Sequence, residues 1–414
     1  MTLQETPTPG FPTLSFLERD RRWAALRELM NRLDLDALVV SGMGRDQLDR
    51  YITNEGTRGL AVMPRAGEPI SLVGTGNITL GRYDEPGREY PRWVSDQRLL
   101  SPTLRLPDVL ADLGVSTSRI GVVGLSSRAP ASMAGTIAYN TWARTVAALP
   151  AATFIDVAAE YEILMVVHSA EELTMIRKSA EIGENACRAM IETAVVGRRE
   201  CEVVAAGMHS VASQGGMWLQ GPQRTGQERL GWAGPDWLWM GGGSHALEHG
   251  DTFGAELFTF YGGFESQQQI EISLGEPTKE ARLLEEVAIA SRQAGLDILR
   301  PGVTFAQLCD AMEAPLRKAA CWNMGPLVQT VSPVIFNSAT HVGLEQDPAF
   351  AGIAIPHLTP RDGDFVIESG VAFAFEPNAC HGKQRVCIGG TVIVTDTGYE
   401  ELNSICNTVN VVRG

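Results

Sequence analysis

Hydrophobic positions in the first 160 residues follow two different periods. Apolar side chains in residues 18–33 recur at helical spacing, which predicts an amphipathic helix with a buried stripe made of Trp23, Leu26, Met30 and Leu33. Short apolar runs of strand length follow, at residues 37–40, 59–63, 70–73, 120–123 and 154–157. Because strand-sized runs alternate with helical patterns, the sequence predicts an α/β domain over residues 1–160.

A second pattern begins after residue 160. Ser169-Ala-Glu-Glu172 has the form of a capping box, in which a serine hydroxyl and a glutamate satisfy the free N–H groups at the start of a helix. Leu173, Ile176 and Ala180 then supply an apolar stripe. We therefore predict a second domain over residues 161–414 that opens with a helix.

Composition narrows the classes of function. The 414 residues carry a net charge of −15, which argues against a phosphate-backbone partner, so no nucleic acid is expected. No apolar stretch approaches the roughly 18–20 residues of a membrane helix, and the N-terminus lacks the pattern of a signal peptide. Seven scattered cysteines without C-x-x-C spacing favour reduced thiols in a cytoplasmic protein, although a catalytic thiol at Cys380 or Cys387 is an open alternative.

The C-terminal part contains the most informative stretch. In residues 368–377 a short turn leads into a strand that ends in Glu376 and a proline. Together with residues 385–398 it resembles the C-terminal strand pair of the pita-bread enzymes, which include methionine aminopeptidase, aminopeptidase P, prolidase and creatinase. Residues 165–180 and 299–305 are also similar to segments of that family. The resemblance implies an α/β N-terminal domain, an α+β pita-bread catalytic domain and a homodimer with shared active sites.

The resemblance also assigns metal positions. Peptidases of this family hold two metal ions with two aspartates, one histidine and two glutamates. Here Glu256 stands at the first aspartate, Gln267 at the second and Gly389 at the final glutamate, while Glu376 is retained. Because two divalent cations need several anionic oxygen ligands, we predict a metal-free protein without a cofactor.

The family's histidine ligand is displaced in this sequence. Aligned on Gly343-Leu344, Thr340 takes the ligand position and His341 lies one residue later. A shift of one residue turns a side chain to the opposite face of a strand. His341 would reach the site only through a bulged loop, and we keep it as a candidate substrate-binding residue.

Creatinase is the metal-free precedent in the family. The Trp-x-Trp element of Trp237 and Trp239 resembles a creatinase segment, and indole faces attract cationic groups, although a half-buried strand with both indoles in the core would look the same. The creatinase-type catalytic histidine then corresponds to His245, with His249 as a rival. Gln269 replaces one of two guanidinium-binding glutamates, which weakens the case for a guanidinium substrate.

Arg58 resembles the creatinase arginine that reaches the substrate carboxylate of the partner subunit, a task that suits its bidentate fork; an ordinary surface arginine is the alternative. We therefore predict a metal-independent, creatinase-like hydrolase that cleaves a C–N bond of a small nitrogen-containing carboxylate. His245 would relay a proton, Glu256 would act on water or as a nucleophile, and Glu376 would hold the cationic part of the substrate. Gln267 and Gln269 would contact the substrate.

Three alternatives stay open from the sequence. One is a lyase acting on a small onium carboxylate such as dimethylsulfoniopropionate. The others are a metal-dependent Xaa-Pro peptidase and a non-catalytic pita-bread binding module. If Glu256 and Glu376 share a partly dry site, one of the two carboxyl groups should have a raised pKa, because two close carboxylates do not both ionise easily.

Overall fold

The computed structural model describes residues 10–42, 47–56, 59–73, 92–99, 102–126, 136–228, 230–231, 234–352 and 362–413. The chain forms two compact units, Met1–Glu171 and Glu172–Gly414. The boundary that the sequence placed between residues 160 and 161 falls within the short helix α6 (Ala158–Ile163).

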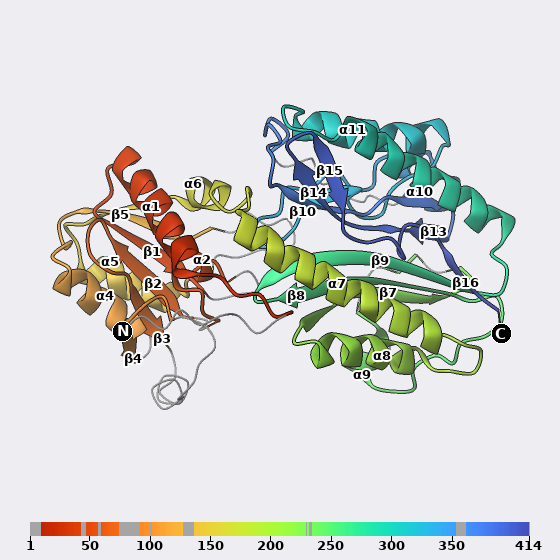
Figure 1. Cartoon of the computed structure of the whole chain (residues 1–414), viewed down its shortest axis with the longest axis horizontal. Helices are drawn as coiled ribbons and strands as arrows, with labels where there is room; N and C mark the ends of the chain where they lie inside the picture. Colours follow the sequence, from red (N-terminus) through yellow and green to blue (C-terminus); the bar gives the residue numbers. More distant parts are fainter. Residues whose placement is uncertain are drawn as a thin grey trace. The chain divides into compact units, whose positions relative to one another are not determined.

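The first unit is built on one mixed six-stranded sheet in the order β4-β3-β2-β1-β5-β6 (Figure 1). Strand β1 pairs antiparallel with β2 and parallel with β5. Apolar residues of β1, β2, β3 and β5 form the core together with α4. The strands are β1 (Ala37–Ser41), β2 (Leu60–Pro64), β3 (Ile70–Val73), β4 (Asp96–Leu99), β5 (Arg119–Val123) and β6 (Thr153–Asp156), and the helices are α1 (Phe16–Arg32), α2 (Arg50–Thr53), α4 (Pro102–Asp112), α5 (Tyr139–Ala148) and α6. The predicted α/β domain is confirmed.

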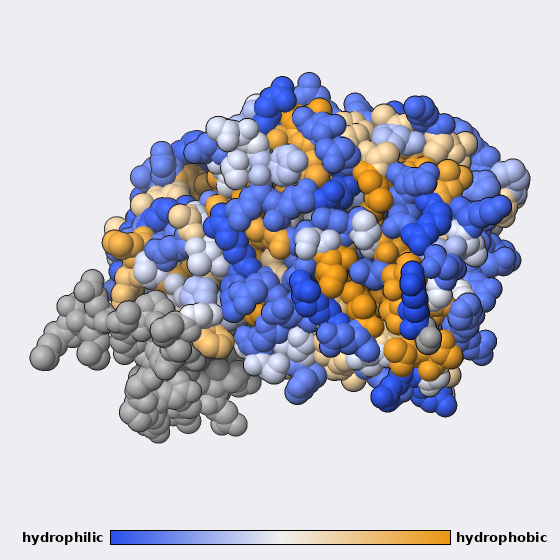
Figure 2. All heavy atoms as spheres, turned by 45° about the vertical axis from the view of Figure 1, so that its right-hand side comes forward, coloured by the Kyte–Doolittle hydropathy of each residue, from blue (hydrophilic) through white to orange (hydrophobic). Residues whose placement is uncertain are grey.

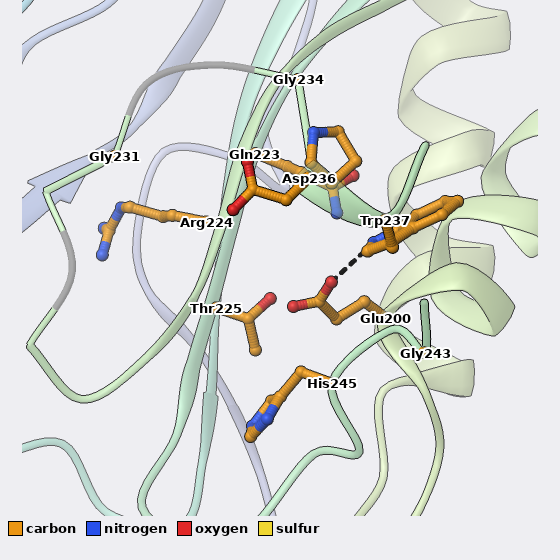
Figure 3. A pocket seen from close by; sticks show the side chains of 11 residues that line it. Glu200, Gln223, Arg224, Thr225, Gly231, Gly234, Asp236, Trp237, Gly243 and His245 are labelled. Atoms are coloured by element: carbon orange, nitrogen blue, oxygen red, sulfur yellow. Dashed lines mark hydrogen bonds between the residues drawn. The ribbon is translucent and has the colours of Figure 1, made fainter. Parts of the chain in front are cut away.

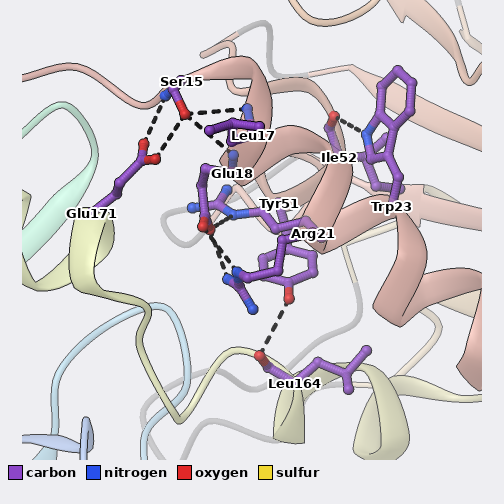
Figure 4. Close-up of polar contacts among 10 residues, drawn as sticks. Ser15, Leu17, Glu18, Arg21, Trp23, Tyr51, Ile52, Leu164 and Glu171 are labelled. Carbon is purple, nitrogen blue, oxygen red and sulfur yellow. Dashed lines mark hydrogen bonds and ion pairs between the residues drawn. The ribbon is translucent and has the colours of Figure 1, made fainter.

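Helix α1 begins directly after Ser15, whose side chain satisfies the first N–H groups of the helix. Ser15 Oγ accepts hydrogen bonds from the N–H groups of Leu17 and Glu18, and it donates to the carboxylate of Glu171 at 2.7 Å (Figure 4). Such a cap contributes about 1 kcal/mol to helix stability. One turn later, Arg22 is buried, and it forms an ion pair with Glu18 at 2.7 Å.

The second unit contains an eight-stranded sheet. Its main order is β10-β11-β14-β9-β8-β7, with β15 paired to β14 and β16 paired to β9. The strands are β7 (Met217–Gly226), β8 (Thr252–Tyr261), β9 (Phe264–Leu274), β10 (Val328–Thr330), β11 (Ala372–Phe375), β14 (Gly389–Thr395), β15 (Gly398–Glu401) and β16 (Asn410–Val412), and β12 (Asn378–His381) with β13 (Gln384–Cys387) forms a separate hairpin. In the described part of this unit, five α-helices and two short 3₁₀ helices accompany the sheet: α7 (Ala170–Thr193), α8 (Glu200–Ser213), α9 (Asp236–Met240), α10 (Lys279–Ile298), α11 (Phe305–Lys318), Leu344–Gln346 and Pro348–Phe350.

Helix α7 begins one residue after Ser169, as the capping motif predicted, and it packs on the sheet through small residues. Ser179 Oγ donates to the carbonyl of Thr259 at 2.7 Å. Gly183 lies against Gln268, where a Cβ would fall 2.1 Å from the amide oxygen. Because side chains alternate along a strand, Gln268 faces α7 while its neighbours Gln267 and Gln269 face the other side of the sheet.

The surface of the protein carries no large uniform patch in the view of Figure 2, where apolar and hydrophilic residues are interspersed. No helix in the described part of the chain is both long and apolar enough to cross a membrane.

Candidate active site

The register of three neighbouring strands brings the candidate residues together. Glu256 of β8 lies opposite Gln269 of β9, and Gln269 lies opposite Gly389 of β14. Directly paired residues share one face of a sheet, so these positions point to the same side, away from α7. Glu376 follows the end of β11, which is separated by β14 and β9 from β8, the strand of Glu256.

Side-chain amides hold the two carboxylates of this face. Gln269 Nε2 donates to Glu256 Oε1 at 2.8 Å, and Gln329 Nε2 of β10 donates to Glu376 Oε1. With its amide nitrogen turned toward the acids, Gln267 donates to Glu256 Oε1 and to Glu376 Oε1, each at 3.0 Å. Both carboxylates thus share one amide, and their oxygens are within about 6 Å of each other. We name these five residues the carboxylate–amide cluster.

Burial shapes the charge of the cluster. Glu256 and Glu376 are each 3% exposed. Burial raises the pKa of Glu376 well above its usual range, and the nearby charge of Glu256 raises it further, while the hydrogen bond from Gln329 opposes the shift. The raised pKa expected for one member of the pair therefore belongs to Glu376, which keeps a proton where an ordinary glutamate would be ionised.

Gly389 occupies the place of the family's final glutamate, and its backbone excludes any side chain. Its φ is +115°, and a Cβ built there would lie 2.2 Å from the backbone oxygen of Phe375. Only glycine is comfortable with such a φ. The local backbone conformation therefore excludes a carboxylate at this position, and substitution of Gly389 alone cannot restore one.

This conformation gives a stability prediction. Gly389→Ala should lower the melting temperature by several degrees, because the strained backbone alone costs on the order of 1–3 kcal/mol and the overlap with Phe375 adds to it. The matched control is Gly398→Ala in β15, where a Cβ would meet no atom within 4 Å. Thermal denaturation of both variants is the measurement. Equal melting temperatures would contradict the close approach at Gly389.

Arg224 and Glu271 continue the same face of the sheet, and Arg385 of the β12–β13 hairpin lies beside them. Arg224 of β7 donates to Glu271 Oε1 of β9 and to the carbonyl of Arg385, each at 2.5 Å. All three residues are at most 6% exposed. Sequence reasoning missed this group and Gln329. The spacing of Glu271 from Gln267 and Gln269, two residues per step along one strand, was the signal that could have found it.

The two cysteines near the site have the character of structural thiols. Burial raises the pKa of Cys380 to about 12 and raises that of Cys387 still further. Cys387 Sγ lies 3.5 Å from Gln269 Oε1. Because the thiolate is the nucleophilic form, neither residue has the properties of a catalytic cysteine.

His245 and Trp237 lie in a pocket of about 430 Å³ beside β7 (Figure 3). His245 Nε2 is 2.7 Å from Asp251 Oδ2, which fixes the orientation of the imidazole. Trp237 Nε1 donates to Glu200 Oε2 at 2.7 Å. The described residues that line this pocket do not include Glu256 or Glu376, so the predicted site residues fall into two groups.

The remaining sequence candidates lie in other places. The Trp-x-Trp element forms the short helix α9 rather than a strand, and Trp239 is 79% exposed. His249 is exposed, and its ring lies against Gly275. His341 has a φ of +63°, and its Nδ1 is 3.1 Å from Thr340 Oγ1. Arg58 lies outside the described residues.

Comparison with known proteins places this geometry in context. A family model described as metallopeptidase family M24 matches residues 174–396. An uncharacterized hydrolase/peptidase of Sinorhizobium fredii is 22% identical over 75% of this chain and 78% of its own length. An Xaa-Pro dipeptidase of Pyrococcus furiosus is 24% identical over 58% of this chain and 63% of its own length.

Solved structures are similar along nearly the whole chain. An X-Pro aminopeptidase of Thermotoga maritima superposes with a TM-score of 0.73 at 15% identity, over 94% of this chain and 99% of that one. A dipeptidase of Mycobacterium ulcerans superposes with a TM-score of 0.70 at 18% identity, over 97% of this chain and 100% of that one. At these identities the likeness concerns the fold, and it confirms the predicted two-domain pita-bread architecture.

Proposed function

Since the chain belongs to the metallopeptidase family M24, we propose that it is a hydrolase of this family that cleaves a C–N bond of a small nitrogen-containing carboxylate without two metal ions. The observation that carries the proposal is the carboxylate–amide cluster, in which Gln267 bridges Glu256 and Glu376. An amide that donates N–H groups to both acids occupies the space between them with hydrogen-bond donors.

The donor set does not fit the two metal ions that the family name implies. A dinuclear site needs several anionic oxygens, and here the N–H groups of Gln267, Gln269 and Gln329 are directed at the two remaining carboxylates. Gly389 can supply no side chain. Among the residues that the structure describes, no group of three or more His, Cys, Asp and Glu is arranged to hold a metal ion.

A carboxyl pair that shares one proton can perform acid–base hydrolysis. Glu256 would accept a proton from a water molecule while the oxygen of that water attacks the carbon of the C–N bond. Glu376, which keeps its proton because of burial and the charge of Glu256, would donate it to the leaving nitrogen. These roles differ from those expected from the sequence, where Glu376 held the substrate cation, because the raised pKa lies on Glu376.

Metal independence is directly testable. Protein purified without added metal should contain well under one equivalent of Mn, Fe, Co or Zn by elemental analysis. A chelator should leave both hydrolysis and the melting temperature unchanged, because no donor set depends on an ion. Near two equivalents of metal, lost together with activity on chelation, would instead support a metal-dependent Xaa-Pro peptidase.

A further inference from the structure

The pocket beside β7 carries polar groups that the proposed chemistry does not use. It is formed by the start of α8, by α9, by β7 and by the loop that contains His245 (Figure 3). The described residues around it are Glu200, Gln223, Arg224, Thr225, Gly231, Gly234, Pro235, Asp236, Trp237, Gly243 and His245. Its volume of about 430 Å³ suits a small molecule.

Two polar atoms in the wall of this pocket have no hydrogen-bond partner. They are Gln223 Nε2 and Thr225 Oγ1, and their residues are 7% and 2% exposed. Buried polar groups are nearly always satisfied, since an unsatisfied group costs on the order of 1–3 kcal/mol. Two such atoms in one pocket indicate a polar ligand that would supply their hydrogen-bond partners.

An irregularity in β7 places these side chains. The pairing of β7 with β8 shifts between Gln220 and Gln223, directly beside Glu256. Gly221 approaches the backbone of Glu256 so closely that a Cβ would lie 2.1 Å from its carbonyl oxygen. Bulges of this kind re-aim the side chains that follow them and are common next to active sites.

The charges that face the pocket are predominantly negative. Glu200 is 6% exposed, one of its oxygens accepts from the Trp237 indole, and its carboxylate points toward Thr225 (Figure 3). Asp236 adds a second carboxylate to the lining. The charge of Arg224 is matched by Glu271 at 2.5 Å. A cation is therefore the favoured occupant, and the Trp237 ring adds an aromatic wall.

We propose that this pocket is a separate binding site for a small organic cation that has an N–H group and an acceptor oxygen beside it. The N–H group would donate to Glu200 and Thr225 Oγ1, and the acceptor oxygen would receive the free N–H of Gln223. This site is independent of the proposed hydrolysis. Arg224 lies opposite Gly254 and shares the face of Glu256, whereas Gln223 and Thr225 alternate with it along β7 and face the other side of the sheet.

The test measures binding of glycinamide, which carries an ammonium group next to a carbonyl, to the full-length protein by calorimetry at neutral pH. Glu200→Gln, which keeps an acceptor for Trp237 but removes the charge, should weaken binding roughly 10²-fold. The matched control is Glu202→Gln, which removes an equal charge from a partly exposed residue of the same helix that does not line the pocket, and it should change binding little. Acetamide, which lacks the cation, should not bind measurably.

A second variant keeps the test decisive if Glu200→Gln does not fold. Thr225→Val removes the free hydroxyl at nearly constant volume and should weaken glycinamide binding roughly 3- to 10-fold. Equal affinity of wild type, Glu200→Gln and Thr225→Val, or no binding to wild type, would overturn the inference. Binding needs no turnover, so it should persist in Glu256→Gln. That result separates failure of this site from failure of the proposed hydrolysis.

Discussion

A Glu376→Gln variant is expected to lose roughly 10²- to 10⁴-fold in kcat, the range for removing a general acid. Glutamine still accepts the hydrogen bond from Gln329 and fits the same buried space, but it cannot protonate a leaving nitrogen. The measurement is steady-state hydrolysis of the amide that a screen of small amides and Xaa-Pro dipeptides identifies. Thermal denaturation checks that the variant folds.

The pH dependence of the wild type should come from the same group. Burial and the charge of Glu256 raise the pKa of Glu376, so activity should extend to higher pH than an ordinary glutamic acid allows and should fall as the pH rises through that pKa. Glu276→Gln, an exposed position, serves as the control and should keep both kcat and the alkaline limit. If Glu376→Gln kept wild-type kcat, Glu376 could not be the proton donor.

Much of the fold could be read from local patterns. Apolar runs of four or five residues predicted β1, β2, β3 and β5, since a strand buried on both faces needs a mostly apolar run, and a similar run predicted the more exposed β6. The half-buried strand considered as an alternative for the Trp-x-Trp element is not formed, because alternation over three residues is too short to distinguish a strand from one helical turn. Here α9 begins directly after Pro235, and the exposed Trp239 takes no part in a core.

Only part of the candidate site could be predicted from the sequence. Glu256, Gln267 and Gln269 could be placed on one face, because their spacing along two paired strands is a local property. Gln329 could not be found in this way, since it reaches Glu376 through the pairing of β10 with β11, and their residues are far apart in the sequence. The separation of His245 from the carboxylates likewise depends on how the loop after α9 folds, which no short-range pattern encodes.

Glu256→Gln should lower kcat by roughly 10²- to 10⁴-fold through loss of the general base, and it should also change how stability depends on pH. An unfolded glutamate has a pKa of about 4.3. The pKa of Glu376 is raised in the folded protein. The stability that this group contributes is therefore full below the unfolded pKa and is lost as the pH rises through the folded pKa.

Removing the charge of Glu256 should bring the pKa of Glu376 down, so less stability is lost at high pH. The melting temperature of Glu256→Gln, relative to wild type, should therefore be higher at pH 8 than at pH 4.5. Each unit of pKa shift corresponds to about 1.4 kcal/mol of unfolding free energy. Each kcal/mol changes the melting temperature by about 2–4 °C for a domain of this size. The exposed Glu276→Gln should show no such difference. An equal offset at both pH values for Glu256→Gln would show that the two carboxyl groups do not share a proton, and the acid–base pair would lose its physical basis.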